Sequence, residues 1–120
     1  VDQVRATSTY GLRDVWFTNA TTGYAVGDGG NILKTSNGTS WTPLTSVTSA
    51  GLTAIHFPSA TTGYAVGEVG TIIKTASSGA SWGLLTSGIA NDLNDVFFPT
   101  NDVGFAVGNG GTIIKTTDQG

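Results

Sequence analysis

Apolar residues along this chain fall into short runs separated by glycine, threonine, serine and asparagine. The run at 12–17 is Leu-Arg-Asp-Val-Trp-Phe, the next at 23–27 is Gly-Tyr-Ala-Val-Gly, and a third at 32–35 is Ile-Leu-Lys-Thr. Runs of this length that are rich in β-branched and aromatic residues are typical of β-strands. The Gly29-Gly30 pair lies between the second and third runs, where glycine supplies the positive φ of a tight hairpin turn. The pattern predicts an all-β fold, with a fourth strand beginning at Trp41.

The same set of four strands occurs three times. The first run returns at 52–57 and 93–98, at offsets of 40 and then 41 residues. A period of about 40–45 residues with four strands per unit is the sequence signature of a β-propeller, in which each unit forms one blade. We therefore predict one domain of three four-stranded antiparallel blades. The repeats are expected at approximately 12–51, 52–92, and 93–120 together with 1–11.

Residues 1–9 match the end of a repeat rather than its beginning. Aligning the repeats places Val1 in register with Trp82, and Val4 with Leu85. The third repeat shows three strands up to the end of the sequence. We therefore expect residues 1–9 to form a fourth strand that completes the last blade.

Three blades are too few for a closed propeller, which typically has about four to eight. An open array would expose two apolar blade faces, and none of the three repeats has the polar face of a capping unit. We expect two chains to close head to tail into a six-bladed homodimer, with the N-terminal strands exchanged. A monomer, a nine-bladed trimer and a piece of a longer propeller are the alternatives. The sequence has no methionine, which indicates a processed chain or part of a longer one.

Composition narrows the possible functions. Charged residues make up 11 % of the chain, the net charge is −3, and the five basic residues argue against a nucleic-acid partner. Cysteine is absent, which excludes disulfides and thiolate metal sites. No apolar run approaches the roughly 18 residues of a membrane span. We expect no cofactor and no metal, and the surface composition favours a secreted, periplasmic or lumenal location.

The string 23–35, followed by Trp41, resembles the Asp-box (BNR) repeat, most closely that of photosystem II assembly and stability factors. The family pattern is Ser/Thr-x-Asp-x-Gly-x-x-Trp. Residues 116–120 fit its first part, Ser77 replaces the aspartate in the second copy, and the first copy is one residue short. The resemblance covers essentially the whole chain and implies a β-propeller whose boxes are structural turns away from the central channel. Asp-box propellers include sialidases, sortilin-type receptors, lectin-like binders and assembly factors.

The residues do not favour an enzyme. A sialidase of this family needs three arginines around a carboxylate, and this chain has Arg5 and Arg13. Asp14 and Asp95 share one repeat position and are a formal acid–base pair. We favour a backbone-capping role for them and predict no catalytic residues. We interpret Tyr24, Tyr64, Trp41, Trp82 and the repeated lysines as structural residues. Asp28, Glu68 and Asn109 are interpreted as solvated turn residues.

Two positions vary where their neighbours are repeated. One carries Trp16, His56 and Phe97, and the other carries arginine, threonine and asparagine in turn. Packing of flat rings is the simplest interpretation of the first position, and a lone histidine has no evident triad partners. The functional alternative is a binding surface near the channel. Its candidate residues are Arg13, Trp16, His56, Asn94 and Phe97.

We therefore expect a non-enzymatic propeller that serves as a binding or assembly scaffold and recognises a protein surface or a glycan. A carbohydrate-binding, lectin-like propeller is one alternative. A structural propeller fragment that assembles by oligomerisation without a ligand of its own is another.

Overall fold

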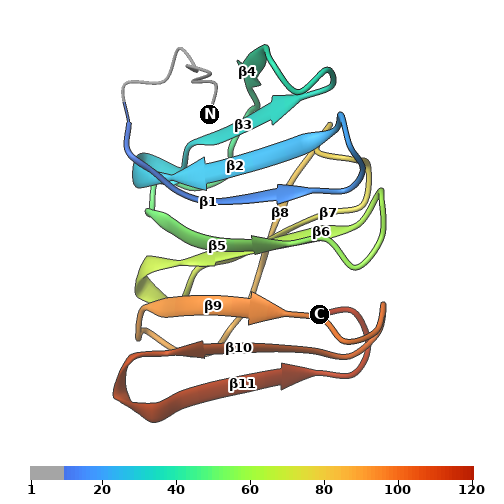
Figure 1. The fold of residues 1–120 in the computed structure, drawn as a ribbon. Coiled ribbons are helices and arrows are strands. Elements are labelled where there is room, and N and C mark those ends of the chain that lie inside the picture. Colours follow the sequence, from blue (N-terminus) through green and yellow to red (C-terminus); the bar gives the residue numbers. More distant parts are fainter. Residues whose placement is uncertain (1–9) are drawn as a thin grey trace.

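The computed structural model describes residues 10–120, which form three antiparallel β-sheets (Figure 1). The first sheet has the order β1-β2-β3-β4 and the second β5-β6-β7-β8. Within the described residues the third sheet has three strands, β9-β10-β11. The strands are β1 (Leu12–Phe17), β2 (Gly23–Gly27), β3 (Ile32–Thr35), β4 (Trp41–Pro43), β5 (Leu52–His56), β6 (Gly63–Gly67), β7 (Ile72–Thr75), β8 (Gly83–Leu85), β9 (Leu93–Phe97), β10 (Gly104–Gly108) and β11 (Thr112–Thr116).

These sheets confirm the predicted all-β propeller blades. Single 3-10 turns follow β2, β6 and β10, at the glycine-rich segments where hairpin turns were predicted. The fourth strand expected at residues 1–9 lies outside the described residues. Blade closure by a second chain likewise stays a prediction.

The glycine that opens each second strand is required by an aromatic ring. A Cβ added at Gly63 would lie 2.4 Å from the ring of Phe57, and the other blades repeat this contact between Gly23 and Phe17 at 2.6 Å. No real Cβ tolerates such a distance, so the ring of the first strand covers the glycine of the second. This packing explains why the phenylalanine and the glycine recur together in every repeat.

The blades stack face to face, with β1, β5 and β9 side by side in the same direction (Figure 1). Aromatic residues form the joints between blades. Tyr24 stacks on Phe57 at 4.3 Å between the first and second blades, and Tyr64 stacks on Phe98 at 3.9 Å between the second and third. Each such ring stabilises its joint by roughly 1.5–3 kcal/mol of apolar burial.

A repeated lysine ties each blade to the next. Tyr24 Oη and Lys34 Nζ donate to the carbonyl of Ser78 over 2.8 and 2.7 Å. The joint between the second and third blades repeats this arrangement. Tyr24, Tyr64 and the invariant lysine therefore have the structural role that was predicted for them.

The box turns between third and fourth strands share one hydrogen-bonded form. Thr35 Oγ1 accepts the N–H groups of Asn37 and Gly38, as Thr75 Oγ1 does for its own turn and Thr116 Oγ1 for the third. Asn37 Oδ1 also accepts the N–H of Ser40 at 2.9 Å, in the manner of an Asx turn. The Asn37 side chain thus stabilises this turn, which lacks the aspartate of the family pattern.

Candidate functional site

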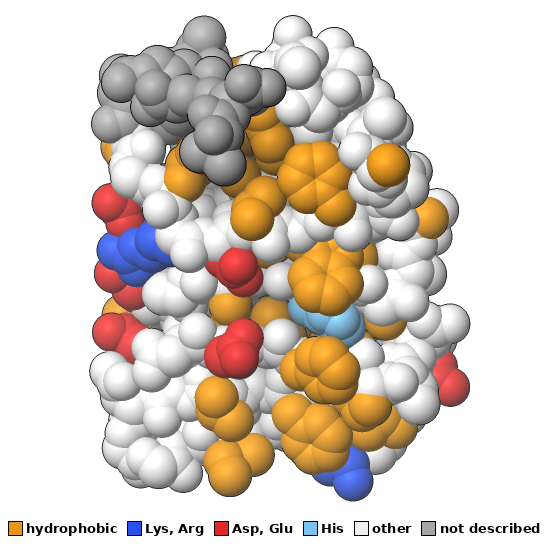
Figure 2. Space-filling model, viewed as in Figure 1, with side chains coloured by type: hydrophobic (Ala, Val, Ile, Leu, Met, Phe, Trp, Pro, Cys, Tyr) orange, Lys and Arg blue, Asp and Glu red, His pale blue; other side chains and the backbone are white. Residues whose placement is uncertain are grey.

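The first strands bring three aromatic rings of the candidate set together. Trp16 on β1 meets His56 on β5 edge to face at 4.4 Å between ring centroids, and His56 stacks on Phe97 of β9 at 4.9 Å. Figure 2 shows hydrophobic side chains in a row down one face, with the histidine among them. We call Trp16, His56 and Phe97 the aromatic row.

The three rings differ in what they present to solvent. Phe97 is 56 % exposed, Trp16 is partly buried, and His56 is 5 % exposed. A large apolar ring left this open is a candidate contact for another molecule. Phe97 and Trp16 therefore supply the accessible surface of the row, and His56 supports them from beneath.

His56 is also part of the joint between blades. Its Nδ1 accepts the backbone N–H of Phe98 at 3.0 Å. Desolvation by burial lowers the pKa of His56, while the nearby Asp95 carboxylate acts in the opposite direction. A neutral ring with Nδ1 unprotonated satisfies both the burial and the hydrogen bond. The packing interpretation of this histidine is therefore the one its contacts support.

Two carboxylates lie two residues before rings of the row, on the same side of their strands. Asp14 accepts the N–H of Val15 through Oδ1 and that of Ile55, in the next blade, through Oδ2, both at 2.9 Å. Asp95 accepts the N–H of Val96 through Oδ1 at 2.9 Å. Both oxygens of Asp14 thus cap backbone groups, as expected for a structural residue. The two carboxylates also place negative charge beside the aromatic row.

Arg13 is placed apart from the row, on an acidic rim. Its Nη2 lies 2.5 Å from Asp28 Oδ1 and its Nη1 lies 3.4 Å from Glu68 Oε2, which joins the first and second blades. Figure 2 shows a basic side chain among acidic ones at the edge of this face, to one side of the hydrophobic row. The turn residues Asp28 and Glu68 thus pair with a cation instead of being simply solvated.

Asn94 is the other candidate that the structure separates from the row. Its Nδ2 donates to Asn109 Oδ1 at 3.0 Å within the third blade. Thr53, at the equivalent position in the second blade, donates from Oγ1 to the carbonyl of Leu93. The variable position 13, 53 and 94 thus serves contacts within and between blades, and the aromatic position forms the continuous surface.

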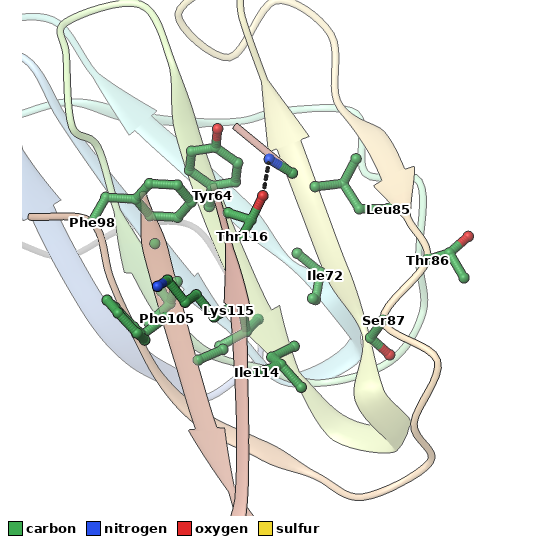
Figure 3. Close-up of a pocket in the computed structure, with 15 residues that line it drawn as sticks. Tyr64, Ile72, Leu85, Thr86, Ser87, Phe98, Phe105, Ile114, Lys115 and Thr116 are labelled. Atoms are coloured by element: carbon green, nitrogen blue, oxygen red, sulfur yellow. Dashed lines mark hydrogen bonds between the residues drawn. The ribbon is translucent and has the colours of Figure 1, made fainter. Parts of the chain in front are cut away.

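A cavity of about 180 Å³, absent from the sequence interpretation, lies between the second and third blades (Figure 3). Its lining includes Tyr64, Leu85, Phe98 and Ile114. Between the first and second blades, Trp82 fills the equivalent space and packs in the apolar core with Tyr24, Phe57 and Ile73. The spacing of the box tryptophans is the sequence signal that could have located this cavity.

Among residues 10–120, no group of three or more His, Asp or Glu side chains is arranged to hold a metal ion. Over the same residues, no helix has the length and apolar character needed to cross a membrane.

Solved structures share this arrangement of blades. A structure of YCF48 bound to D1 peptide superposes with a TM-score of 0.86 and 24 % identity, over 98 % of this chain and 40 % of that one. YCF48 from Cyanidioschyzon merolae gives 0.84 and 19 % identity, over 99 % of this chain and 40 % of that one. The chain consists of β-propeller blades. It spans less than half the length of either YCF48 chain.

An ancestral GH74 enzyme also superposes on these propeller blades. The TM-score is 0.72 at 17 % identity, over 91 % of this chain and 17 % of that one. No family model matches the sequence, and no curated protein matches it either. The resemblance to the photosystem II assembly factor repeat is thus supported at the level of fold. The Asp-box assignment stays a prediction.

Proposed function

We propose that this propeller is a non-enzymatic scaffold that binds an extended protein segment across β1, β5 and β9, on the side where Trp16 and Phe97 are accessible. The observation that carries the proposal is the aromatic row, whose ring contacts of 4.4 and 4.9 Å cross all three blades. Aromatic side chains supply much of the binding energy at protein interfaces. A continuous row suits a partner that runs from blade to blade.

Charge indicates what kind of segment fits. The flanking Asp14 and Asp95, the acidic rim and the net charge of −3 favour a partner with apolar and basic residues. YCF48, which shares the fold, has been solved with a D1 peptide. That precedent, taken with the aromatic row, supports a peptide as the ligand class here.

The carboxylates support binding more than catalysis. Both oxygens of Asp14 accept backbone N–H groups, so this side chain is held as a cap and not as a free acid or base. The likeness to a GH74 enzyme concerns the fold, and one fold hosts many activities. A glycan is the second ligand class, because an exposed ring beside a carboxylate, as in Phe97 and Asp95, also suits a sugar.

We also propose that the working unit is a ring of two chains. Apolar side chains on the two outer blades are exposed, among them Val15 and Phe17 on the first blade and Val107 and Ile113 on the third. Burying both faces against a second copy would close six blades, a common propeller size.

Fluorescence anisotropy with a labelled D1 peptide tests the binding proposal, with a scrambled peptide as the control. We expect Phe97→Ala to weaken binding by about tenfold, which corresponds to about 1.4 kcal/mol. Leu84→Ala removes an equally exposed apolar side chain on β8 and should leave binding unchanged. The chain mass is measured for both variants, so that a change of assembly is not mistaken for a loss of contacts. Equal binding of the scrambled peptide, or a glycan-array signal in its place, would reject a peptide ligand.

A further inference from the structure

Each joint between blades is closed by a tyrosine and a lysine that share one acceptor. At the second joint, Tyr64 Oη and Lys74 Nζ both lie 2.8 Å from the carbonyl oxygen of Gln119. The acceptor at the first joint is the carbonyl of Ser78. Both acceptor residues have left-handed backbone, with φ of 69° for Gln119 and 56° for Ser78. This conformation turns the carbonyl of the box toward the preceding blade.

The first blade lacks that acceptor residue. In the second blade, Thr75 Oγ1 accepts the N–H of Gly79, four residues along the chain, at 2.9 Å. In the first blade, Thr35 Oγ1 accepts the N–H of Gly38, three residues along, at the same 2.9 Å. The residue omitted is the one that corresponds to Ser78. The outer face of the first blade therefore offers no equivalent carbonyl.

The third blade keeps the lysine but lacks the tyrosine hydroxyl, one of the two donors. Phe105 occupies the position of Tyr24 and Tyr64, and it has no hydroxyl group. It is 36 % exposed, whereas Tyr64 is 1 % exposed. Water can hydrate the hydroxyl of an exposed tyrosine, whereas a buried hydroxyl without an acceptor destabilises the contact. Phenylalanine therefore suits a ring that is covered where no acceptor is present. The missing hydroxyl on the last blade thus matches the missing acceptor on the first.

We propose that the third blade of one copy packs on the first blade of a second copy, with Phe105 against the shortened box turn at 35–38. The inference rests on the two-chain ring proposed above. Lys115, whose Nζ lies 5.7 Å from the centroid of the Phe105 ring, faces the same turn. A partner protein of another kind would not explain why the missing hydroxyl at Phe105 and the missing acceptor in the turn at 35–38 occur together.

The rest of the two outer faces has the pattern of an interior joint. Val107 on the third blade is 40 % exposed, whereas the equivalent Val66 is fully buried by the next blade. Phe17 on the first blade is 41 % exposed, whereas the equivalent Phe57 is 4 % exposed. Interior joints cover these positions with another copy of the same repeat. A second chain offers that repeat in the required order.

The cavity beside β11 belongs to the same contact. Among the described residues, β11 pairs with β10 alone, and the equivalent β7 pairs with β8, which follows Trp82. In the alignment of the repeats, Val1 stands at the position of Trp82. The cavity of about 180 Å³ lies where the interior joint holds the tryptophan. Roughly 150 Å³ is enough to hold a benzene ring, so this cavity has room for an aromatic side chain.

Sedimentation equilibrium of the full chain and three variants tests the contact. The variants are Phe105→Tyr, a serine inserted between Asn37 and Gly38, and both changes together. Tyrosine alone buries a hydroxyl without an acceptor and should raise the dimer dissociation constant on the order of tenfold. The inserted serine restores the acceptor, so the double variant should bind more tightly than the two single effects predict. Leu84→Ala is the control that should change nothing.

Val1→Trp is a second and independent probe, because the repeats align Val1 with Trp82, so the change restores the tryptophan expected at the start of a fourth strand. It should lower the dissociation constant, and circular dichroism confirms folding of every variant. Coupling between the two distant changes, with a tighter Val1→Trp dimer, supports the contact. A dimer with neither effect overturns the contact and leaves the two-chain ring standing. A monomer at every concentration overturns both, while peptide binding is measured separately.

Discussion

Lys34 Nζ lies 2.7 Å from the carbonyl oxygen of Ser78, and this hydrogen bond joins the first blade to the box turn of the second. The carbonyl also accepts from Tyr24 Oη at 2.8 Å, so two donors from one blade meet one acceptor from the next. The ammonium lies 5.3 Å from the centroid of the Tyr24 ring as well. A repeated charged residue thus stabilises the stacking of blades.

Lys34→Met should destabilise the chain because it removes this hydrogen bond and keeps the apolar stem. We expect a loss of about 1–2 kcal/mol, the range for a hydrogen bond to a charged group that is partly open to water. Urea denaturation with a constant m-value measures it. Lys115→Met is the comparison. Lys115 contacts a phenyl ring of its own blade and, among residues 10–120, donates to no backbone carbonyl. A loss as large for Lys115 as for Lys34 would contradict the assignment.

The two glycines Gly63 and Gly83 should respond differently to alanine. A Cβ at Gly63 would lie 2.4 Å from the Phe57 ring, whereas nothing lies within 4 Å of a Cβ at Gly83. Gly63→Ala should cost about 2–3 kcal/mol through overpacking. Gly83→Ala should be neutral or slightly stabilising, because alanine restricts the unfolded chain. Melting temperatures measure both, and a stable Gly63→Ala protein would show that the ring can move aside.

His56 should make stability depend on pH below neutrality. Burial lowers its pKa in the folded protein, so the unfolded chain binds the proton more tightly. Stability contributed by neutral His56 is complete above the unfolded pKa of about 6.5 and falls as the pH drops below it. His56→Phe, which places the ring found at position 97, should remove this part of the pH dependence. Melting temperatures of both proteins between about pH 5 and 7.5 test the point, and parallel curves would exclude His56 as the cause.

Asp95→Asn should weaken a basic, apolar peptide while leaving the fold intact. The amide oxygen can still accept the N–H of Val96, and the change removes the charge beside the row. We expect a loss of roughly threefold to tenfold, which decreases as salt is added. Asp102→Asn changes the net charge equally, away from the row, and is the matched control. If both variants bind alike, the effect belongs to net charge and not to the site.

The sequence was sufficient to predict the blades because one pattern recurs three times, and chance does not reproduce Gly-x-Ala-Val-Gly at a fixed spacing. The contact between Gly63 and Phe57 gives that recurrence its physical cause. The aromatic row could be proposed because the varying position held a ring in every repeat. The solvent exposure of its rings could not be predicted, since the burial of His56 depends on how closely two blades stack.

Other features depended on contacts between blades. Arg13 and Asn94 share a repeat position with each other but not with the row, and their partners decide where they lie. Arg13 pairs with Asp28 on the rim, and Asn94 pairs with Asn109. The cavity beside β11 appears once the strands are placed in space, because its walls come from two repeats.

A two-dimensional NMR titration of the isotopically labelled full chain with the D1 peptide tests the binding proposal most directly. We predict shifts at the Trp16 indole N–H, at the Phe97 ring and at the backbone of β5 and β9, while signals of Leu84 on β8 stay in place. Shifts confined to β8 and β11, or no shifts when the peptide is in excess, would contradict a binding surface at the aromatic row.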